Sequence, residues 1–322
     1  MVKQIELLCG FFSVNPELSK QSGKLYYLPD DRVYETYQEM FEKEAKLPEG
    51  ERMDFVSIVT PNFVHFAPAM MALENGFHVL LDKPITFTLD EAFQLKEQIN
   101  KTGLTFALTH TYSGYPAVKQ AKHMVAEGRL GKIRKVYVED PQGWLSSKVK
   151  DAGNAQASWR NDPKKSGKAG CMGDIGTHAH QLAEYITGLQ VTELCAEINV
   201  FVPNRLLDDD GTALLRFDNG AKGVLMASQV AAGEENAVKI RAYGDKGGFE
   251  WNQHEPNSLI LKWTNQPMQI MRVGTSMDTA IAAHNTRTPG GHPEGYLEAF
   301  ANIYRNFSLT VRAKANGEEP TA

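Results

Sequence analysis

The stretch Phe55–Pro84, FVSIVTPNFVHFAPAMMALENGFHVLLDKP, contains two short apolar runs on either side of a helical pattern. The runs cover Phe55–Thr60 and His78–Leu81, and both are predicted strands. Between them, Phe63–Glu74 has the pattern of a helix, and Asn62 is a plausible cap at its start. A strand, a helix and a second strand in this order predict a parallel sheet covered by helices.

The same alternation extends along the chain in both directions. Upstream, Ile5–Ser13 is predicted to be a buried strand and Val33–Ala45 a helical stretch. Downstream, Thr88–Glu91 forms a capping box that opens a helix, Leu104–Leu108 is the next strand, and Ala117–Glu127 is the next helix. We therefore expect an α/β unit with a Rossmann-like parallel sheet at the start of the chain.

Ligands of such sheets bind outside the carboxyl ends of the strands. Three segments are expected at these ends: Thr60-Pro61-Asn62, Asp82-Lys83-Pro84 and His110-Thr111-Tyr112. The three loops are therefore expected to line one crevice.

The pattern changes after about Val136, where strands replace the alternation. Asp218-Asn219-Gly220 is a strong hairpin signal, and we expect a mostly antiparallel sheet with few helices, an α+β arrangement. The predicted domains are residues 1–114, Rossmann-like and dinucleotide-binding, and residues 115–322, an open sheet for substrate binding and oligomerisation. The predicted elements of the second are a loop over residues 145–170, strands over Ile133–Glu139, Leu214–Phe217, Gly223–Ser228, Val238–Tyr243, Gly248–Trp251, Leu259–Trp263 and Met268–Val273, and a final helix over Tyr296–Phe307.

Composition narrows the classes of partner. The 322 residues carry a net charge of −5, which argues against nonspecific binding to nucleic acid. No apolar run approaches the roughly 20 residues needed to span a bilayer, so no membrane partner is expected. Three cysteines without a CxxC pair, and a start without the layout of a signal peptide, favour a reducing, cytoplasmic location.

The stretch Gly170–Tyr185, GCMGDIGTHAHQLAEY, concentrates groups that could perform acid–base chemistry. Asp174 and His178 are four residues apart, so on a helix they share one face. An imidazole is the natural proton acceptor near neutral pH, and a neighbouring carboxylate can bind a substrate hydroxyl or orient the ring. From residue types alone, a capping Asp174 beside a merely buried His178 explains the pattern equally well.

Lys83 stands between an acid and a proline at a predicted strand end. A cis bond to Pro84 would hold this lysine in a fixed turn, where it could stabilise developing negative charge on an oxygen. The alternative is an ordinary solvated lysine.

Loop residues with aromatic or hydrogen-bonding side chains suit a sugar-like ligand, although core packing would also explain the tryptophans. They are Tyr112, Gln142, Trp144, Trp159 and Arg160, and His292 is a loop histidine that could close the site.

Two other kinds of chemistry are not expected. His178 and His180 diverge by about 200° on a helix, and no second His/Cys cluster completes a tetrahedral site with Asp174, so no metal is predicted. The sequence has no G-x-S-x-G elbow, which argues against a serine hydrolase.

Two motifs give the chain a family resemblance. Asp82-Lys83-Pro84 resembles the E-K-P motif of the Gfo/Idh/MocA oxidoreductases, and the G-x-x-x-D-x-G-x-H pattern from Gly170 to His178 is similar to that family's second motif. Their order, their distance and the change from α/β to an open sheet fit as well, so the resemblance covers nearly the whole chain.

The resemblance implies an enzyme that moves a hydride between NAD or NADP and a hydroxyl-bearing carbon of a sugar, anhydrosugar or polyol. It implies that Lys83 binds the reacting oxygen, Asp174 holds the substrate and His178 is the general acid/base. The stretch that starts at Trp159-Arg160 resembles members acting on pyranosides or anhydrosugars. A homo-oligomer, a dimer or a tetramer, is expected through the sheet domain. The implied cofactor-binding residues are Ser13, Thr60, Pro61, Asn62, His65, Asp82 and Lys83.

Two departures from the family pattern affect the cofactor. No G-x-G-x-x-G turn occurs near the start, and Ile5–Ser13 resembles the second strand of a dinucleotide-binding unit, so the chain is expected to lack the first βα unit. The position of the usual ribose-binding acid holds Ser13, which is compatible with NAD or NADP. Alternatives are a cofactor-deficient sugar-binding or scaffold relative, and a lyase or hydrolase that uses transient oxidation.

Overall fold

The computed structural model describes residues 5–146, 162–275 and 278–320, which form two compact units. The first unit comprises the described residues of Met1–Thr109 and Tyr304–Ala322, and the second comprises those of His110–Ile303. The C-terminal helix α10 (Tyr296–Ala315) therefore contributes to both units, which the expected division into residues 1–114 and 115–322 does not include.

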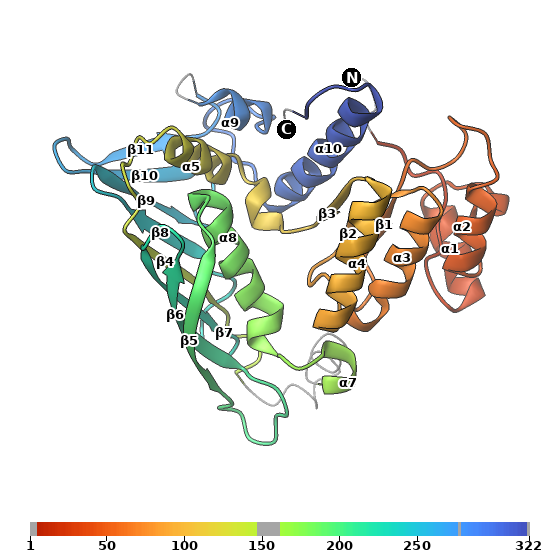
Figure 1. The fold of residues 1–322 in the computed structure, drawn as a ribbon, viewed down its shortest axis with the longest axis horizontal. Coiled ribbons are helices and arrows are strands. Elements are labelled where there is room, and N and C mark those ends of the chain that lie inside the picture. The colour runs from red at the N-terminus through yellow and green to blue at the C-terminus, as the bar shows by residue number, and fades with distance from the viewer. Residues whose placement is uncertain (1–4, 147–161, 276–277, 321–322) are drawn as a thin grey trace. The chain divides into compact units, whose positions relative to one another are not determined.

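The first unit contains a three-stranded parallel sheet, as predicted (Figure 1). Its strands are β1 (Phe55–Ile58), β2 (His78–Leu81) and β3 (Phe106–Leu108), in the order β1-β2-β3. Helices α3 (Phe66–Glu74) and α4 (Leu89–Thr102) pack side by side. Their apolar faces and the strands bury one core, which includes Ile58, Ala69, Leu73, Val79, Leu81 and Leu95.

The predicted capping box is confirmed at the start of α4. The Thr88 hydroxyl accepts from the Glu91 amide, and the Glu91 carboxylate accepts from the Thr88 amide, which satisfies two backbone donors at the helix start. The helix ends at Gly103, whose φ of 67° lies in the left-handed region that glycine adopts without steric cost.

Three predictions for the first unit were wrong in detail. Ile5–Ser13 is not a regular strand: only Gly10 pairs, through an isolated parallel bridge to Val33. Consequently the helix α2 begins later than predicted, at Tyr37, and runs to Glu44. Asn62 does not cap α3, because residues 62–64 form a short 3₁₀ turn before the helix.

One helix of the first unit was not predicted. It is α1 (Pro16–Leu25), and its start carries two ordinary signals. The Asn15 side chain accepts from the amides of Glu17 and Leu18, and Pro16 occupies the first helical position.

The second unit is built on an eight-stranded sheet with the order β11-β10-β9-β8-β4-β7-β6-β5. Strand β4 is parallel to β7 and antiparallel to β8, and every other neighbouring pair is antiparallel. The predicted open sheet is therefore confirmed. The strands are β4 (Lys135–Pro141), β5 (Val191–Asn199), β6 (Asp210–Phe217), β7 (Lys222–Ser228), β8 (Lys239–Tyr243), β9 (Gly247–Asn252), β10 (Ser258–Trp263) and β11 (Gln269–Arg272).

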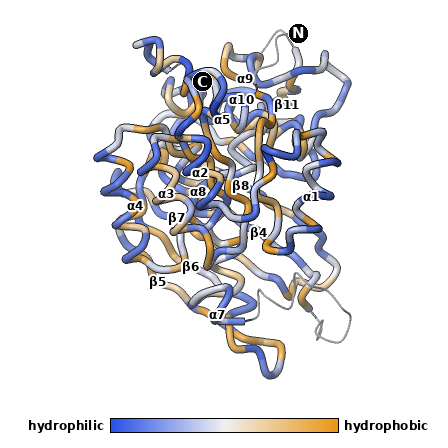
Figure 2. Tube along the Cα trace, turned by 90° about the vertical axis from the view of Figure 1, so that its right-hand side faces the viewer, coloured by the Kyte–Doolittle hydropathy of each residue, from blue (hydrophilic) through white to orange (hydrophobic). Residues whose placement is uncertain are grey.

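Alternation along these strands decides which face is covered. In β6, Ala213, Leu215 and Phe217 are buried while Leu214 and Arg216 are exposed, and the change of hydropathy along the chain can be followed in Figure 2. Helices α5 (Pro116–Ala126) and α8 (Thr177–Thr187) pack on the sheet (Figure 1). Together they bury the larger of the two main cores.

The predicted turn between β6 and β7 is confirmed, with Gly220 at a φ of 88°. The described part of residues 145–170 contains a short helix, α7 (Pro163–Ser166), and α9 (Ala280–His284) precedes the final loop. Within residues 5–146, 162–275 and 278–320, no helix is long and apolar enough to cross a membrane.

Candidate active site

Four strands of the second unit have an end on the same side of the sheet, where the strands stop. This row of strand ends is the polar edge. The carboxyl ends of β4 and β7 lie there because these strands are parallel, with Pro141 opposite Ser228. The amino ends of β6 and β8 lie at the same edge because both are antiparallel to these strands. The topology therefore gathers polar residues that are far apart in sequence: Asp140, Gln142, Asp208, Asp209, Gln229 and Asn236.

Asp174 and His178 come to this edge from a segment with two kinds of helical turn. Residues Met172–Gly176, including Asp174, form a π-helical turn, and α8 begins at Thr177. The prediction of one helix is therefore correct only from Thr177 onward. Such π-turns are rare in proteins, and those that occur are often found at functional sites.

The imidazole of His178 is buried among aromatic rings. Its ring meets that of Tyr112 edge-on, with centroids 4.9 Å apart, and that of His110 at 5.8 Å. Both partners come from the segment around the 3₁₀ turn Thr111–Gly114. His110 was expected in a ligand-facing loop but was not predicted as a site residue.

An ordered chain of hydrogen bonds ends on the hydroxyl of Tyr112. The indole N–H of Trp144 donates to Gln142 Oε1 at 2.8 Å, and Gln142 Nε2 donates to Asn236 Oδ1 at 2.8 Å. Asn236 Nδ2 then donates to the Tyr112 hydroxyl at 3.0 Å. Three predicted substrate-binding residues are thereby joined in one network, through an asparagine that was not predicted.

The phenol of Tyr112 is held in its neutral form. Burial raises the pKa of Tyr112 far above its ordinary value, and the negative charge of Asp140 raises it further. The hydrogen bond from Asn236 opposes this shift without cancelling it. Tyr112 is therefore a neutral hydrogen-bonding group at any pH near neutrality.

In the first unit, Asp82 joins the ends of two strands. Its Oδ1 accepts from the amide of Lys83 at 2.8 Å and from the hydroxyl of Thr109 at 2.8 Å. The bond between Lys83 and Pro84 is cis, as the sequence suggested. Lys83 therefore follows a residue that is fixed at the carboxyl edge of the parallel sheet.

His65 joins the loop after β1 to the loop after β2. Its Nε2 lies 2.7 Å from the carbonyl oxygen of Thr60, and its Nδ1 lies 2.7 Å from that of Pro84. Both partners are backbone carbonyl acceptors, so the ring donates its N–H toward one of them and the tautomer decides which. The ring is fully buried, which makes it a structural clamp between the two loops.

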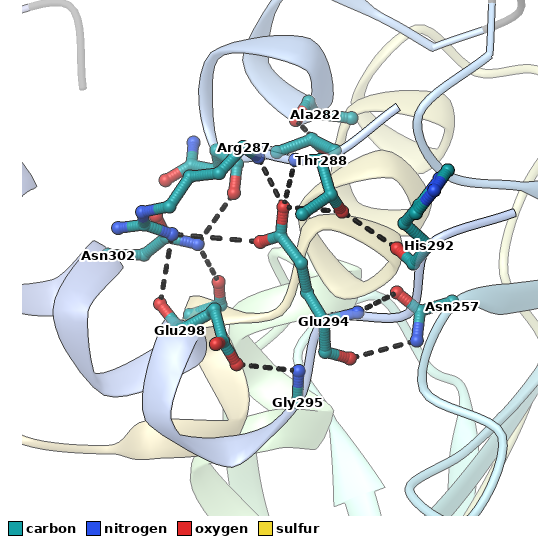
Figure 3. Close-up of polar contacts among 12 residues, drawn as sticks. Asn257, Ala282, Arg287, Thr288, His292, Glu294, Gly295, Glu298 and Asn302 are labelled. Carbon is teal, nitrogen blue, oxygen red and sulfur yellow. Dashed lines mark hydrogen bonds and ion pairs between the residues drawn. The ribbon is translucent and has the colours of Figure 1, made fainter. Parts of the chain in front are cut away.

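The remaining predicted residues are more dispersed. The hydroxyl of Ser13 accepts from the amide of Asn15, just before α1. His292 is exposed, and its carbonyl accepts from Thr288 in the turn that surrounds Glu294 (Figure 3). His180 is half-exposed and lies beside Glu184. Trp159 and Arg160 lie outside the described residues.

One cavity of about 220 Å³ lies in the first unit, next to α1 and α2. Its walls are mostly charged, and they contain none of the predicted site residues. The lining residues are Pro16, Ser19, Lys20, Asp30, Asp31, Val33, Tyr34, Glu35, Glu39 and Lys43.

A parallel α/β unit followed by an open sheet, with D-K-P after β2 and an acid–histidine pair at α8, defines a nicotinamide-dependent oxidoreductase of two units. The chain belongs to the GFO/IDH/MocA oxidoreductase family. Residues 3–110 match the oxidoreductase family with an NAD-binding Rossmann fold, and residues 118–250 match the GFO/IDH/MocA C-terminal domain. The predicted family, oxidoreductase class and nicotinamide cofactor are confirmed.

Known relatives match the chain over almost all of its length. An uncharacterized oxidoreductase of Bacillus subtilis, YfiI, is 32% identical over 98% of this chain and 80% of the relative. Two solved structures are of an inositol dehydrogenase homolog from Azotobacter vinelandii, and each match covers 97% of this chain and 80% of that one. The complex with NAD⁺ is 34% identical with a TM-score of 0.92, and the complex with NADH and myo-inositol is 33% identical with a TM-score of 0.88.

A more distant relative is levoglucosan dehydrogenase from Pseudarthrobacter phenanthrenivorans. It is 27% identical over 65% of this chain and 58% of the relative.

A nicotinamide dinucleotide fits the residues of this chain in part. The half-exposed residues Thr60, Asn62 and Lys83 stand after parallel strands, where such ligands bind. Between residues 5 and 60, glycine occurs only at positions 10, 23 and 50, so this part contains no G-x-G-x-x-G turn for a pyrophosphate. The fit therefore concerns the nicotinamide end of the cofactor.

Proposed function

We propose that this protein oxidises a hydroxyl-bearing carbon of a polyol or sugar, or reduces the matching carbonyl. NAD or NADP accepts the hydride in the first direction and donates it in the second. The observation that carries this proposal is the setting of His178, four residues after Asp174 and enclosed by Tyr112 and His110. A buried imidazole enclosed by aromatic rings, in a segment that also carries a carboxylate, suits the removal of a hydroxyl proton.

The dinucleotide supplies the acceptor for the hydride, and the protein handles the proton and the charge. His178 takes the proton of the reacting hydroxyl while the carbon that bears it loses a hydride. The C–O single bond becomes a carbonyl. Asp174 accepts a hydrogen bond from a substrate hydroxyl, and the ammonium of Lys83 stabilises the negative charge that develops on the reacting oxygen. Thr60, Pro61, Asn62 and Asp82 would form the nicotinamide end of the cofactor site, with the buried His65 holding its loops together and Ser13 at the ribose.

A polyol is the substrate class that the comparisons favour. The structural match to a complex with myo-inositol is 33% identical over 97% of this chain, whereas the structural match to levoglucosan dehydrogenase with levoglucosan is 23% identical over 95%. Tyr112, Gln142 and Trp144, together with Trp159, Arg160 and His292, are the proposed substrate-binding residues.

Reduction of NAD⁺ or NADP⁺ in the presence of myo-inositol, other polyols and levoglucosan tests this function. The absorbance of the reduced nicotinamide should rise with at least one polyol. One competing function is a sugar-binding relative without a cofactor. Calorimetry that detects polyol binding and no dinucleotide binding would establish that competitor, and product formed without net reduction would indicate a lyase or hydrolase.

We further propose that two or more copies associate through the face of the large sheet opposite α5 and α8. Residues paired between neighbouring strands form a row across this face of the sheet. The apolar residues of this row include Leu214, Val224, Tyr137, Ile260 and Ile270. Leu214 and Ile270 are both 59% exposed. Light scattering should give a multiple of the 35.8 kDa chain, and Leu214→Lys should reduce it, whereas Leu297→Lys on α10 should not.

The three cysteines are free, with Cys9 and Cys171 buried and Cys195 exposed. Free thiols are usual in a reducing compartment, and we place the protein in the cytoplasm on this ground.

A further inference from the structure

The carboxylate of Asp174 is bound by an amide that the proposed mechanism does not use. Gln229 directly follows β7, and its side chain is buried. Its Nε2 donates to Asp174 Oδ2 at 2.9 Å. An amide N–H₂ group can only donate, so this contact favours the ionised carboxylate and fixes the orientation of its two oxygens.

The main chain of Gln229 is itself fixed on both sides. Its amide donates to the carbonyl of Asp209 at 2.9 Å, and its carbonyl accepts from the amide of Leu145 at 3.1 Å. Asp209 is buried and bound in turn, because its carboxylate accepts from the amides of Phe201 and Val202. The donor of Gln229 is therefore held by a rigid frame rather than by a mobile loop end.

The turn that carries Asp174 is fixed by Asp208, the residue next to Asp209. Its carboxylate accepts from the amide of Gly170 at 2.6 Å and from that of Met172 at 2.7 Å, and its carbonyl accepts from the amide of Cys171 at 2.8 Å. These three amides open a helical segment, where backbone donors lack partners within the helix and negative charge is favourable. Two consecutive aspartates thus hold the backbone of the Asp174 turn and the residue that binds its carboxylate.

We propose that Gln229 is a positioning residue for Asp174, holding it ionised and turned so that it accepts a hydrogen bond from the substrate. This inference rests on the proposed function for the role of Asp174. Gln229 itself need not touch the substrate, because it acts through the carboxylate.

Other ionisable groups surround this carboxylate and define the background of its titration. His178 follows on the same helical segment. Several acids also lie near the thiol of Cys171. Burial raises the pKa of this thiol, and nearby negative charges raise it further; in order of decreasing effect they are Asp208, Asp140, Asp210 and Asp174. Several negative charges near one another make a neutral donor such as Gln229 valuable, because it stabilises an anion without adding charge.

The test is the pH titration of the Asp174 carboxyl carbon by NMR, in protein labelled at the aspartate carboxyls, with Asp174→Asn to assign the signal. Gln229→Met removes the donor and nearly keeps the side-chain volume. We expect the midpoint for Asp174 to rise by about one to two pH units, as a lost hydrogen bond to a charged group predicts. The apparent affinity for a polyol should fall roughly 10- to 100-fold.

Gln120→Met is the matched control, because Gln120 is equally buried and bonds Thr279 instead of Asp174. An unchanged Asp174 midpoint in Gln229→Met, or an equal change in Gln120→Met, would overturn the proposal. If Gln229→Met does not fold, Gln229→Glu keeps the side-chain length and should raise the midpoint through like-charge repulsion. The titration needs no turnover, so it tests Gln229 separately from the proposed oxidoreductase reaction.

Discussion

The ring of His178 meets the ring of Tyr112 edge-on, with the two planes at 80° and the centroids 4.9 Å apart. Edge-to-face contacts of this kind are attractive and orient both rings. Since the Tyr112 hydroxyl is itself bound by Asn236, the imidazole rests against a ring that is fixed at its far end. This contact therefore orients the imidazole that we propose as the proton acceptor.

Replacement of His178 by alanine should lower kcat by about 10²- to 10⁴-fold, the usual contribution of a positioned general base. His180→Ala on the same helix is the matched control, because His180 is half-exposed and pairs with Glu184. The measurement is the initial rate of nicotinamide reduction with a saturating polyol. Equal rates for His178→Ala and the wild type would refute the assigned role.

Gly170→Ala should disturb the Asp174 turn from its backbone. A Cβ at this position would lie 2.2 Å from the carbonyl oxygen of Asp208, so the backbone must move. We expect a stability loss of about 1–3 kcal/mol in urea unfolding. Gly176→Ala should cost less, because its Cβ would meet only the end of the flexible Met172 side chain, at 3.3 Å. A larger loss for Gly176→Ala would contradict this explanation.

His65→Ala should separate the loops that follow β1 and β2. The buried polar contacts of the ring are lost together with the ring itself, which joins Thr60 and Pro84. The free energy of unfolding should fall by about 1–3 kcal/mol, as the loss of a buried hydrogen-bonding partner predicts. Urea denaturation measures this, with His254→Ala as the control, since His254 is exposed. A His65→Ala protein as stable as the control would show that the clamp is unimportant.

High pH should destabilise the second unit through Tyr115. Burial raises the pKa of Tyr115 to about 12, from an ordinary value of 10.0. The folded form therefore keeps a proton that the unfolded chain loses first, so this contribution is complete below pH 10 and is lost as pH rises toward 12. Thermal unfolding between pH 9 and about pH 12 should show a smaller decline for Tyr115→Phe than for the wild type. Tyr27→Phe, at an exposed tyrosine, should behave as the wild type does.

The sequence predicts well those elements whose signals are local. The capping box at Thr88, the turn at Gly220 and the strands beside it needed only neighbouring residues to be recognised. Ile5–Ser13 was predicted incorrectly because an apolar run becomes a strand only when another strand pairs along it, and here only Gly10 pairs. Pairing is a property of the whole fold, which a local pattern does not contain.

The candidate site likewise contains some residues that local patterns suggested and others that they did not. Motifs and residue chemistry suggested Lys83, Asp174 and His178, and these assignments remain proposals. Gln229 and Asn236 carried no signal, because an amide in a short polar stretch resembles many surface residues. Their proximity to the site comes from the strand order β8-β4-β7-β6, and strand order was not predicted.

The parallel pairing of β4 and β7 has a practical consequence for engineering. Every segment of the polar network leaves the sheet at one edge, whereas the Asp218-Asn219-Gly220 turn lies at the opposite edge, more than a strand length away. A fluorophore, an affinity tag or a short inserted peptide at this turn would therefore report on the protein without touching its chemistry. The same geometry makes the turn a natural point of attachment to a surface, because the polar edge lies at the other end of the strands.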